Sequence, residues 1–127
     1  MRQRLIGMFA VIHFLLLGMA PSLPGQSLSP DERQKIEALI KYISEMNDAR
    51  FLRNGSTYDA KTAANFLRRK WAANESDVRS ARDFIDKIAT FSGTSGKSYV
   101  VRFKDGREAP TREILLVALK DIERKQN

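Results

Sequence analysis

Apolar residues recur at helical spacing in four segments of the chain. The first segment follows the sequence SPDE at residues 29–32, in which Ser29 can cap a helix, Pro30 suits its first position and Glu32 completes a capping box. The apolar positions of this segment, three or four residues apart, are Ile36, Leu39, Ile40 and Ile43. This spacing places their side chains on one face. The pattern predicts a helix over 30–46.

Three more helices are predicted by the same spacing. They are expected over 60–73, over 80–90, and from 111 to about 122, with Asp59, Ser80 and Thr111 as the residues that cap them. The stripes that support them are Ala63, Phe66, Leu67, Lys70 and Trp71; Ala81, Phe84, Ile85 and Ile88; and Ile114, Leu115, Ala118, Leu119 and Ile122.

One segment alternates with a period of two, which is typical of a strand. Tyr99, Val101 and Phe103 occupy every second position, and the hairpin turn pair Asp105-Gly106 follows them. Pro110 should end the return strand, so we expect a short hairpin over about 98–109. Residues 47–58 contain the turn signal Asn54-Gly55 but too few apolar positions to define a strand, and we expect an ordered loop there.

The resulting fold class is α+β, mostly helical, with about four helices and one short β-hairpin packed on them. A lone hairpin is marginally stable in water, so its apolar face must pack on the helices. Residues 26–127 are long enough for one core, and we expect them to form a single small domain.

The first 25 residues have the organisation of a secretory signal peptide. Two arginines stand within the first four residues, a sixteen-residue apolar stretch covers 5–20, and small and turn-forming residues follow. We expect cleavage after Ala20 or Gly25 and a periplasmic or secreted protein. The alternative is an uncleaved membrane anchor, although the apolar stretch is shorter than the roughly 20 residues that a spanning helix needs.

Composition restricts the chemistry that the exported chain could perform. The chain has no cysteine, and its one histidine, His13, lies in the expected signal peptide. This excludes Ser–His and Cys–His catalysis and metal sites built on imidazole or thiolate, and we expect no metal and no cofactor. Loss of Arg2 and Arg4 lowers the net charge from +7 to +5.

Basic residues cluster around the second predicted helix. Residues 68–70 read RRK, with Arg53 a short distance upstream. Because consecutive helical residues are spread around the axis, Arg68 and Lys70 point roughly 200° apart. One interpretation is a solvated helix surface. The other is an anion site formed by Arg53, Arg68 and the backbone at Asn54-Gly55, which could take a carboxylate, a phosphate or an acidic partner.

Five short motifs stand in a distinctive order over about residues 30–120. They are Phe51-x-Arg53-Asn54-Gly55-x-x-Tyr58, Ala63-Ala64-x-x-Leu67-Arg68-x-Lys70, Phe84-Ile85, Ser95-Gly96-x-x-Tyr99 and Asp105-Gly106-x-x-x-Pro110. In this combination the chain resembles a family of small exported proteobacterial proteins that carry a domain of unknown function. The family often has a histidine where this chain has Phe66, so a role for that histidine does not apply here. The resemblance implies export and one small domain, and it implies no activity, cofactor or partner.

Seven polar residues match the motif positions of that family and form our candidate binding site. They are Arg53, Asn54, Tyr58, Arg68, Lys70, Ser95 and Tyr99. We expect a binding module for an acidic protein surface or an anionic component of the cell envelope, with no nucleic acid as partner, and a membrane only if the signal is uncleaved. The alternative is a small envelope hydrolase or ligand-binding protein that uses Tyr, Lys or carboxylate groups. A pocket that gathers the polar candidates would favour a small ligand, whereas a flat patch would favour a protein partner.

Overall fold

The structure is a computed structural model that describes residues 27–127. The predicted signal peptide lies outside the described residues. Within them, no helix combines the length and the apolar character needed to cross a membrane.

Three of the predicted helices form largely where the sequence places them. Helix α2 spans Pro30–Ser44, and the Ser29 side chain accepts a hydrogen bond from the Glu32 N–H at 3.2 Å. Helix α3 spans Ala60–Ala73, and Asp59 accepts from the Thr62 N–H at 2.9 Å. Helix α5 spans Thr111–Lys125. Its predicted cap is wrong, because Pro110 is the N-cap and Thr111 is already the first helical residue.

The segment predicted as a helix over 80–90 is a shorter, wider structure. After the 3₁₀ turn η2 (Glu75–Asp77), α4 covers only Ala81–Asp83 and continues as the π-helical turn η3 (Phe84–Ile88). The Ala89 N–H bonds the Phe84 carbonyl at 3.1 Å, which is the i→i+5 spacing of a π-helix. The Thr90 hydroxyl then bonds the Ile85 carbonyl at 2.6 Å, and the helix ends.

The described residues form a four-stranded antiparallel sheet in the order β2-β1-β3-β4. Its strands are β1 (Arg50–Arg53), β2 (Ser56–Tyr58), β3 (Val100–Arg102) and β4 (Glu108–Pro110). Strands β3 and β4 form the predicted hairpin. Strands β1 and β2 form a second hairpin in the segment that we expected to be a loop, so that prediction is wrong.

Local turn geometry and a distant partner together explain the second hairpin. Asn54 and Gly55 both have positive φ, 50° and 84°, which suits the two-residue turn that the right-handed twist of paired strands prefers. Strand β1 also pairs with β3, with Phe51 opposite Val101. That partner lies fifty residues away, so a search for local periodicity could not find it.

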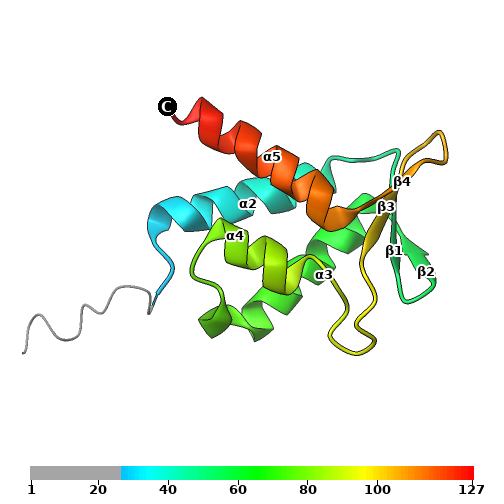
Figure 1. Ribbon diagram of the computed structural model, residues 1–127, viewed down its shortest axis with the longest axis horizontal. Coiled ribbons are helices and arrows are strands. Elements are labelled where there is room, and N and C mark those ends of the chain that lie inside the picture. Colours follow the sequence, from blue (N-terminus) through cyan, green and yellow to red (C-terminus); the bar gives the residue numbers. More distant parts are fainter. Residues whose placement is uncertain (1–26) are drawn as a thin grey trace, which may run out of the picture.

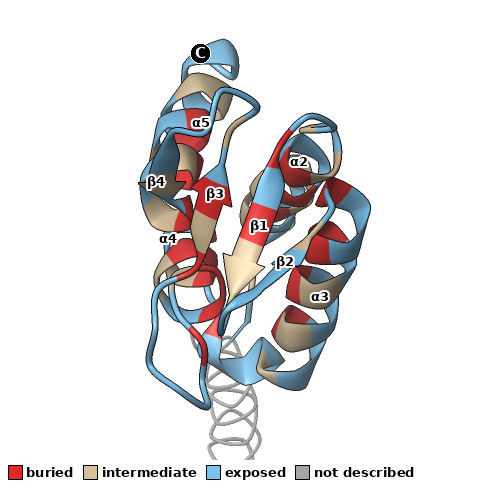
Figure 2. Cartoon of the chain, turned by 90° about the vertical axis from the view of Figure 1, so that its right-hand side faces the viewer, coloured by how far each residue is buried: buried red, intermediate tan, exposed pale blue. Residues whose placement is uncertain are grey.

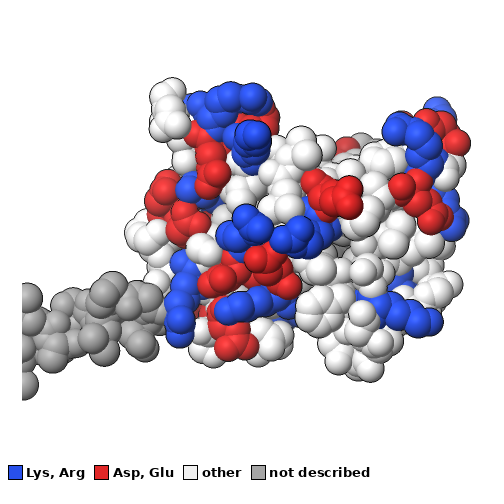
Figure 3. Space-filling view, viewed as in Figure 1, with Lys and Arg blue, Asp and Glu red and all other residues white. Residues whose placement is uncertain are grey.

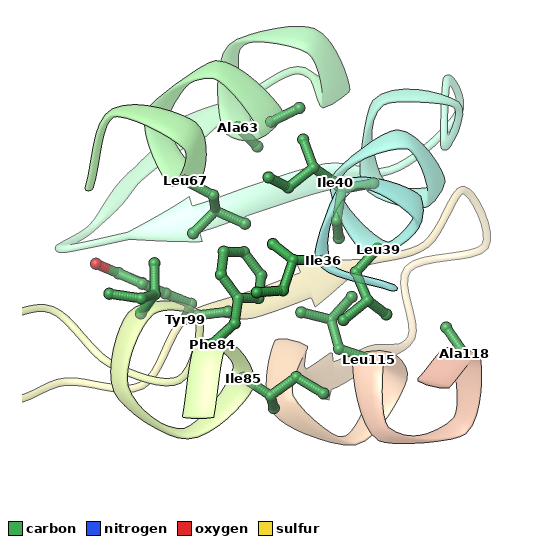
Figure 4. Packing of buried hydrophobic residues seen from close by; sticks show 14 of the residues in the cluster. Ile36, Leu39, Ile40, Ala63, Leu67, Phe84, Ile85, Tyr99, Leu115 and Ala118 are labelled. Atoms are coloured by element: carbon green, nitrogen blue, oxygen red, sulfur yellow. The ribbon is translucent and has the colours of Figure 1, made fainter. Parts of the chain in front are cut away.

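The helices lie on one face of the sheet, and no other described element covers the second face (Figures 1 and 2). The core fills the space between α2, α3, η3 and α5 and the inner face of the sheet (Figure 4). Ile36, Phe84 and Leu115 are fully buried in it. The predicted α+β, mostly helical class is therefore confirmed, with two hairpins instead of one.

Candidate anion-binding pocket

A cavity of about 150 Å³ lies between the β1–β2 hairpin and α3. We call it the Arg53 pocket. Its walls are Phe51, Leu52, Arg53, Tyr58, Thr62, Ala63, Phe66, Leu67, Arg69, Tyr99 and Thr111. The walls are mostly apolar, with a few polar groups, which is the usual composition of a ligand site.

The strand register brings the polar groups of the pocket together. Side chains two positions apart share a face of a strand, so Arg53 lies on the same inner face as the buried Phe51. Tyr58 pairs with Phe51 across the hairpin. Continuing the β1–β3 register by one residue places Tyr99 opposite Arg53, and the Thr111 N–H bonds the Tyr99 carbonyl at 2.9 Å.

Helix α3 supplies the opposite wall. Thr62, Phe66 and Arg69 stand at i, i+4 and i+7, so they follow one stripe along the helix. Phe66 is half-buried, whereas Thr62 and Arg69 are exposed at the mouth of the pocket.

Arg53 contacts an aromatic ring and has a buried nitrogen without a hydrogen-bond partner among the described residues. Its guanidinium carbon lies 4.4 Å from the centre of the Phe66 ring, within the range of a cation–π contact. Its Nε is buried and has no hydrogen-bond partner among the described residues, and the same is true of the Thr111 hydroxyl. A buried donor without a partner costs about 1–3 kcal/mol. Arg53 and Thr111 both line the cavity, so both side chains have hydrogen-bonding capacity that the described residues leave unused.

The electrostatic character of the pocket is positive. Arg53 and Arg69 line it, and none of its described lining residues is a carboxylate. Neither arginine forms an ion pair within residues 27–127, whereas most arginines elsewhere on the domain do, as Arg102 does with Glu108 at 2.8 Å. Figure 3 shows basic and acidic side chains next to one another over part of one face of the molecule, beside broad uncharged areas. The pocket differs from such mixed areas because its charged lining residues, Arg53 and Arg69, are both basic.

Lys70 borders the pocket through Tyr99. Its Nζ donates to the Tyr99 hydroxyl at 2.9 Å and to the Phe91 carbonyl at 2.7 Å. Tyr99 is only 7% exposed and its ring meets Phe66 edge-on, with centroids 6.0 Å apart. Lys70 therefore fixes the Tyr99 wall of the pocket, and its own ammonium is engaged in that contact.

Asn54 and Ser95 hold two loops together beside the pocket. The Ser95 hydroxyl donates to the Asn54 side-chain oxygen, and the Asn54 amide donates to the buried Ser92 hydroxyl at 3.1 Å. These contacts tie the β1–β2 turn to the 91–98 loop. Both residues support the hairpin that carries Arg53, and neither lines the cavity.

Arg68 lies away from the other candidates. Its guanidinium pairs with Glu37 of α2 at 2.8 Å, and it does not line the Arg53 pocket. The structure thus brings together Arg53, Tyr58 and Tyr99, with Lys70 behind them, and leaves Arg68 on another face of α3. Sequence reasoning missed Thr62, Arg69 and Thr111.

Comparison with known protein families places the chain in a family without an assigned activity. The sequence model of a family of unknown function, DUF5329, matches residues 30–123. The chain belongs to this family. The match includes every residue of the Arg53 pocket.

The chain is similar to one curated relative, the uncharacterized protein YfeK of Salmonella typhimurium strain LT2. The two are 30% identical over 73 residues, which cover 58% of this chain and 61% of the relative. The match thus spans less than two thirds of the relative's length. No solved structure matches the chain significantly.

Proposed function

We propose that this DUF5329 domain is an exported binding module that recognises an anionic group in the Arg53 pocket. The observation that carries the proposal is the Arg53 side chain, which lines a mostly apolar cavity and whose buried Nε lacks a hydrogen-bond partner within the described residues. A guanidinium is always charged and presents donors in a planar fork that matches carboxylate and phosphate oxygens. An anion in the pocket would supply the missing acceptor.

The pocket favours a small ligand over the acidic protein surface that the sequence first suggested. A flat basic patch would need Arg68 beside Arg53, yet Arg68 pairs with Glu37. The N-terminal sequence supports export, because a basic start precedes an apolar stretch of signal-peptide length. The ligand would then be met in the periplasm or outside the cell.

Thermal unfolding with sodium acetate as the probe anion tests the proposal. A ligand that binds only the folded state stabilises it by RT ln(1 + [L]/Kd), so a Kd of about 10 mM gives about 1.4 kcal/mol at 100 mM acetate. For a domain of this size that is a rise in Tm of about 7 °C, relative to sodium chloride at the same ionic strength.

Two arginine variants make the test specific. Arg53→Met should abolish the acetate-dependent rise in Tm while the protein still unfolds cooperatively. Arg68→Met removes the same charge from an exposed position on α3 and should keep the full rise. Equal loss in both variants, or no rise in the unmodified protein, would contradict the proposal.

A further inference from the structure

We infer that the ligand of the Arg53 pocket is a monocarboxylic acid with a short apolar body, either a single ring or a chain of about six carbons. This inference rests on the proposed anion site and adds the class of ligand. In it, the carboxylate meets Arg53 and the Thr111 hydroxyl, and the apolar body fills the cavity.

The walls of the cavity determine the character of the ligand body. Phe51, Ala63, Phe66 and Leu67 present hydrocarbon surface, and Phe51 and Leu67 are almost fully buried. Contact between such surface and an apolar group of a ligand stabilises the complex, because both are removed from water. The same surface offers no hydrogen bond to a polar group. A sugar or another polyhydroxylated body would lose its hydration in the cavity without replacement.

The volume sets the length of the ligand. A cavity of about 150 Å³ matches the size at which an apolar protein cavity holds one benzene ring. The pocket could therefore enclose a ring or a short chain. A longer acyl chain would have to leave through the mouth, between Thr62 and Arg69, where it would gain little.

The donors determine the head group. The Phe66 ring lies against the Arg53 guanidinium, with 4.4 Å between the ring centre and the guanidinium carbon. The N–H donors of a guanidinium lie in its plane, so an anion that accepts from them meets its edge. A carboxylate is planar and suits this approach. Among the described lining residues, the one other buried donor without a partner is neutral, namely the Thr111 hydroxyl. Arg69 is exposed at the mouth, so Arg53 supplies the charge inside the pocket. Because the cost of removing an ion from water is already high for a single charge, this donor set favours a monoanion over a doubly charged phosphate.

Titration by two-dimensional ¹H–¹⁵N NMR with a graded series of acids tests the inference. The probes are acetate, butanoate, hexanoate, octanoate and benzoate. They are added to the protein in the form that is purified from the cells that express it. Each buried CH₂ should tighten binding roughly three- to fourfold as far as hexanoate, and the gain should level off at octanoate. Hexanamide, which has the same body without the charge, should bind at least tenfold more weakly than hexanoate.

A variant that fills the mouth of the pocket tests whether the apolar body of the ligand lies inside it. Thr62→Trp places a large side chain at the mouth from an exposed position and should weaken hexanoate binding at least tenfold. Ala73→Trp, at an exposed position further along α3, should leave it unchanged. Circular dichroism and a cooperative thermal transition establish that both variants fold.

The possible failures are distinguishable. If acetate binds but affinity does not increase with chain length, or if inorganic phosphate binds more tightly than hexanoate, the carboxylic-acid inference is wrong while the anion site stands. If no anion binds at all, both proposals are wrong. Tighter binding of N-acetylleucine than of every simple acid would overturn the inference in favour of a peptide C-terminus.

Discussion

Gly55 has a backbone conformation that few other residues tolerate. Its φ is +84°, and it forms the second position of the turn that joins β1 to β2. Side chains at positive φ cost roughly 1–2 kcal/mol, more for a β-branched residue. Gly55→Val introduces a β-branched residue and should therefore lower the free energy of unfolding by about 2 kcal/mol or more, measured by urea denaturation.

Gly93 provides the matched control for that change. It lies in an exposed loop, has no positive φ, and a Cβ built there meets no atom within 4 Å. Gly93→Val should change the free energy of unfolding by less than about 0.5 kcal/mol. Equal destabilisation by both variants would show that the turn geometry is not the cause.

A residue of the pocket could be predicted from sequence where the residues next to it form a recognisable motif. Arg53, Tyr58 and Tyr99 were predicted and do line one pocket. Arg69 was missed although its seven-residue spacing from Thr62 could have indicated a shared stripe. Thr111 could not be found from sequence, because its place opposite Tyr99 depends on the pairing of β3 with β4.

At the level of elements, periodicity predicted the long helices well and the short strands poorly. A fourteen- or fifteen-residue helix repeats its stripe several times, as Ile36, Leu39 and Ile43 do in α2. Strands β1 and β2 have four and three residues, too few for alternation to stand out. Their stability comes from pairing with distant β3 and from packing on α3, both of which are tertiary effects.

Three helices are joined by one ionic cluster around Lys35. Lys35 Nζ donates to Glu32 at 2.8 Å and to Glu123 of α5 at 3.1 Å, and its side chain is only 11% exposed. Glu32 in turn accepts from the Ala81 N–H at the start of α4, at 2.7 Å. Burial alone would raise the pKa of Glu32, but the hydrogen bonds from Lys35 and Ala81 outweigh it and lower that pKa below its ordinary value of 4.5.

The lowered pKa of Glu32 predicts a loss of stability in acid. A carboxyl whose pKa is lower in the folded state contributes fully above its unfolded pKa, and the contribution is lost as pH falls through the folded pKa. Glu32→Gln should cost about 1–2 kcal/mol of unfolding free energy at pH 7. The difference between the variant and the unmodified protein should shrink as pH falls from 5 to 3, as urea denaturation at each pH would measure.

Glu45 offers the comparison for the acid series. It is exposed at the end of α2 and forms no ion pair within the described residues. Glu45→Gln should change the free energy of unfolding by less than about 0.5 kcal/mol. A difference for Glu32→Gln that stays constant from pH 5 to 3 would argue against the ionic cluster.

At the scale of the whole molecule, the proposed location rests on the sequence of the N-terminal segment. If the signal peptide is removed as proposed, the mature chain begins near residues 21–27 and carries a net charge of about +5. We expect N-terminal sequencing to find this start in the periplasmic or secreted fraction of the cell. Recovery of the chain from the membrane fraction with Met1 intact would instead indicate an anchor.

The anion site at Arg53 is tested most directly through the Nε–H group of that residue. Arginine Nε–H signals are visible in ¹H–¹⁵N spectra, and comparison with Arg53→Lys and Arg68→Lys variants assigns the two signals. On addition of hexanoate, we expect a saturable shift of the Arg53 signal and almost none of the Arg68 signal, because only Arg53 has a buried, unpartnered Nε within the described chain. An Arg53 signal that stays in place while other arginine signals move would contradict the account.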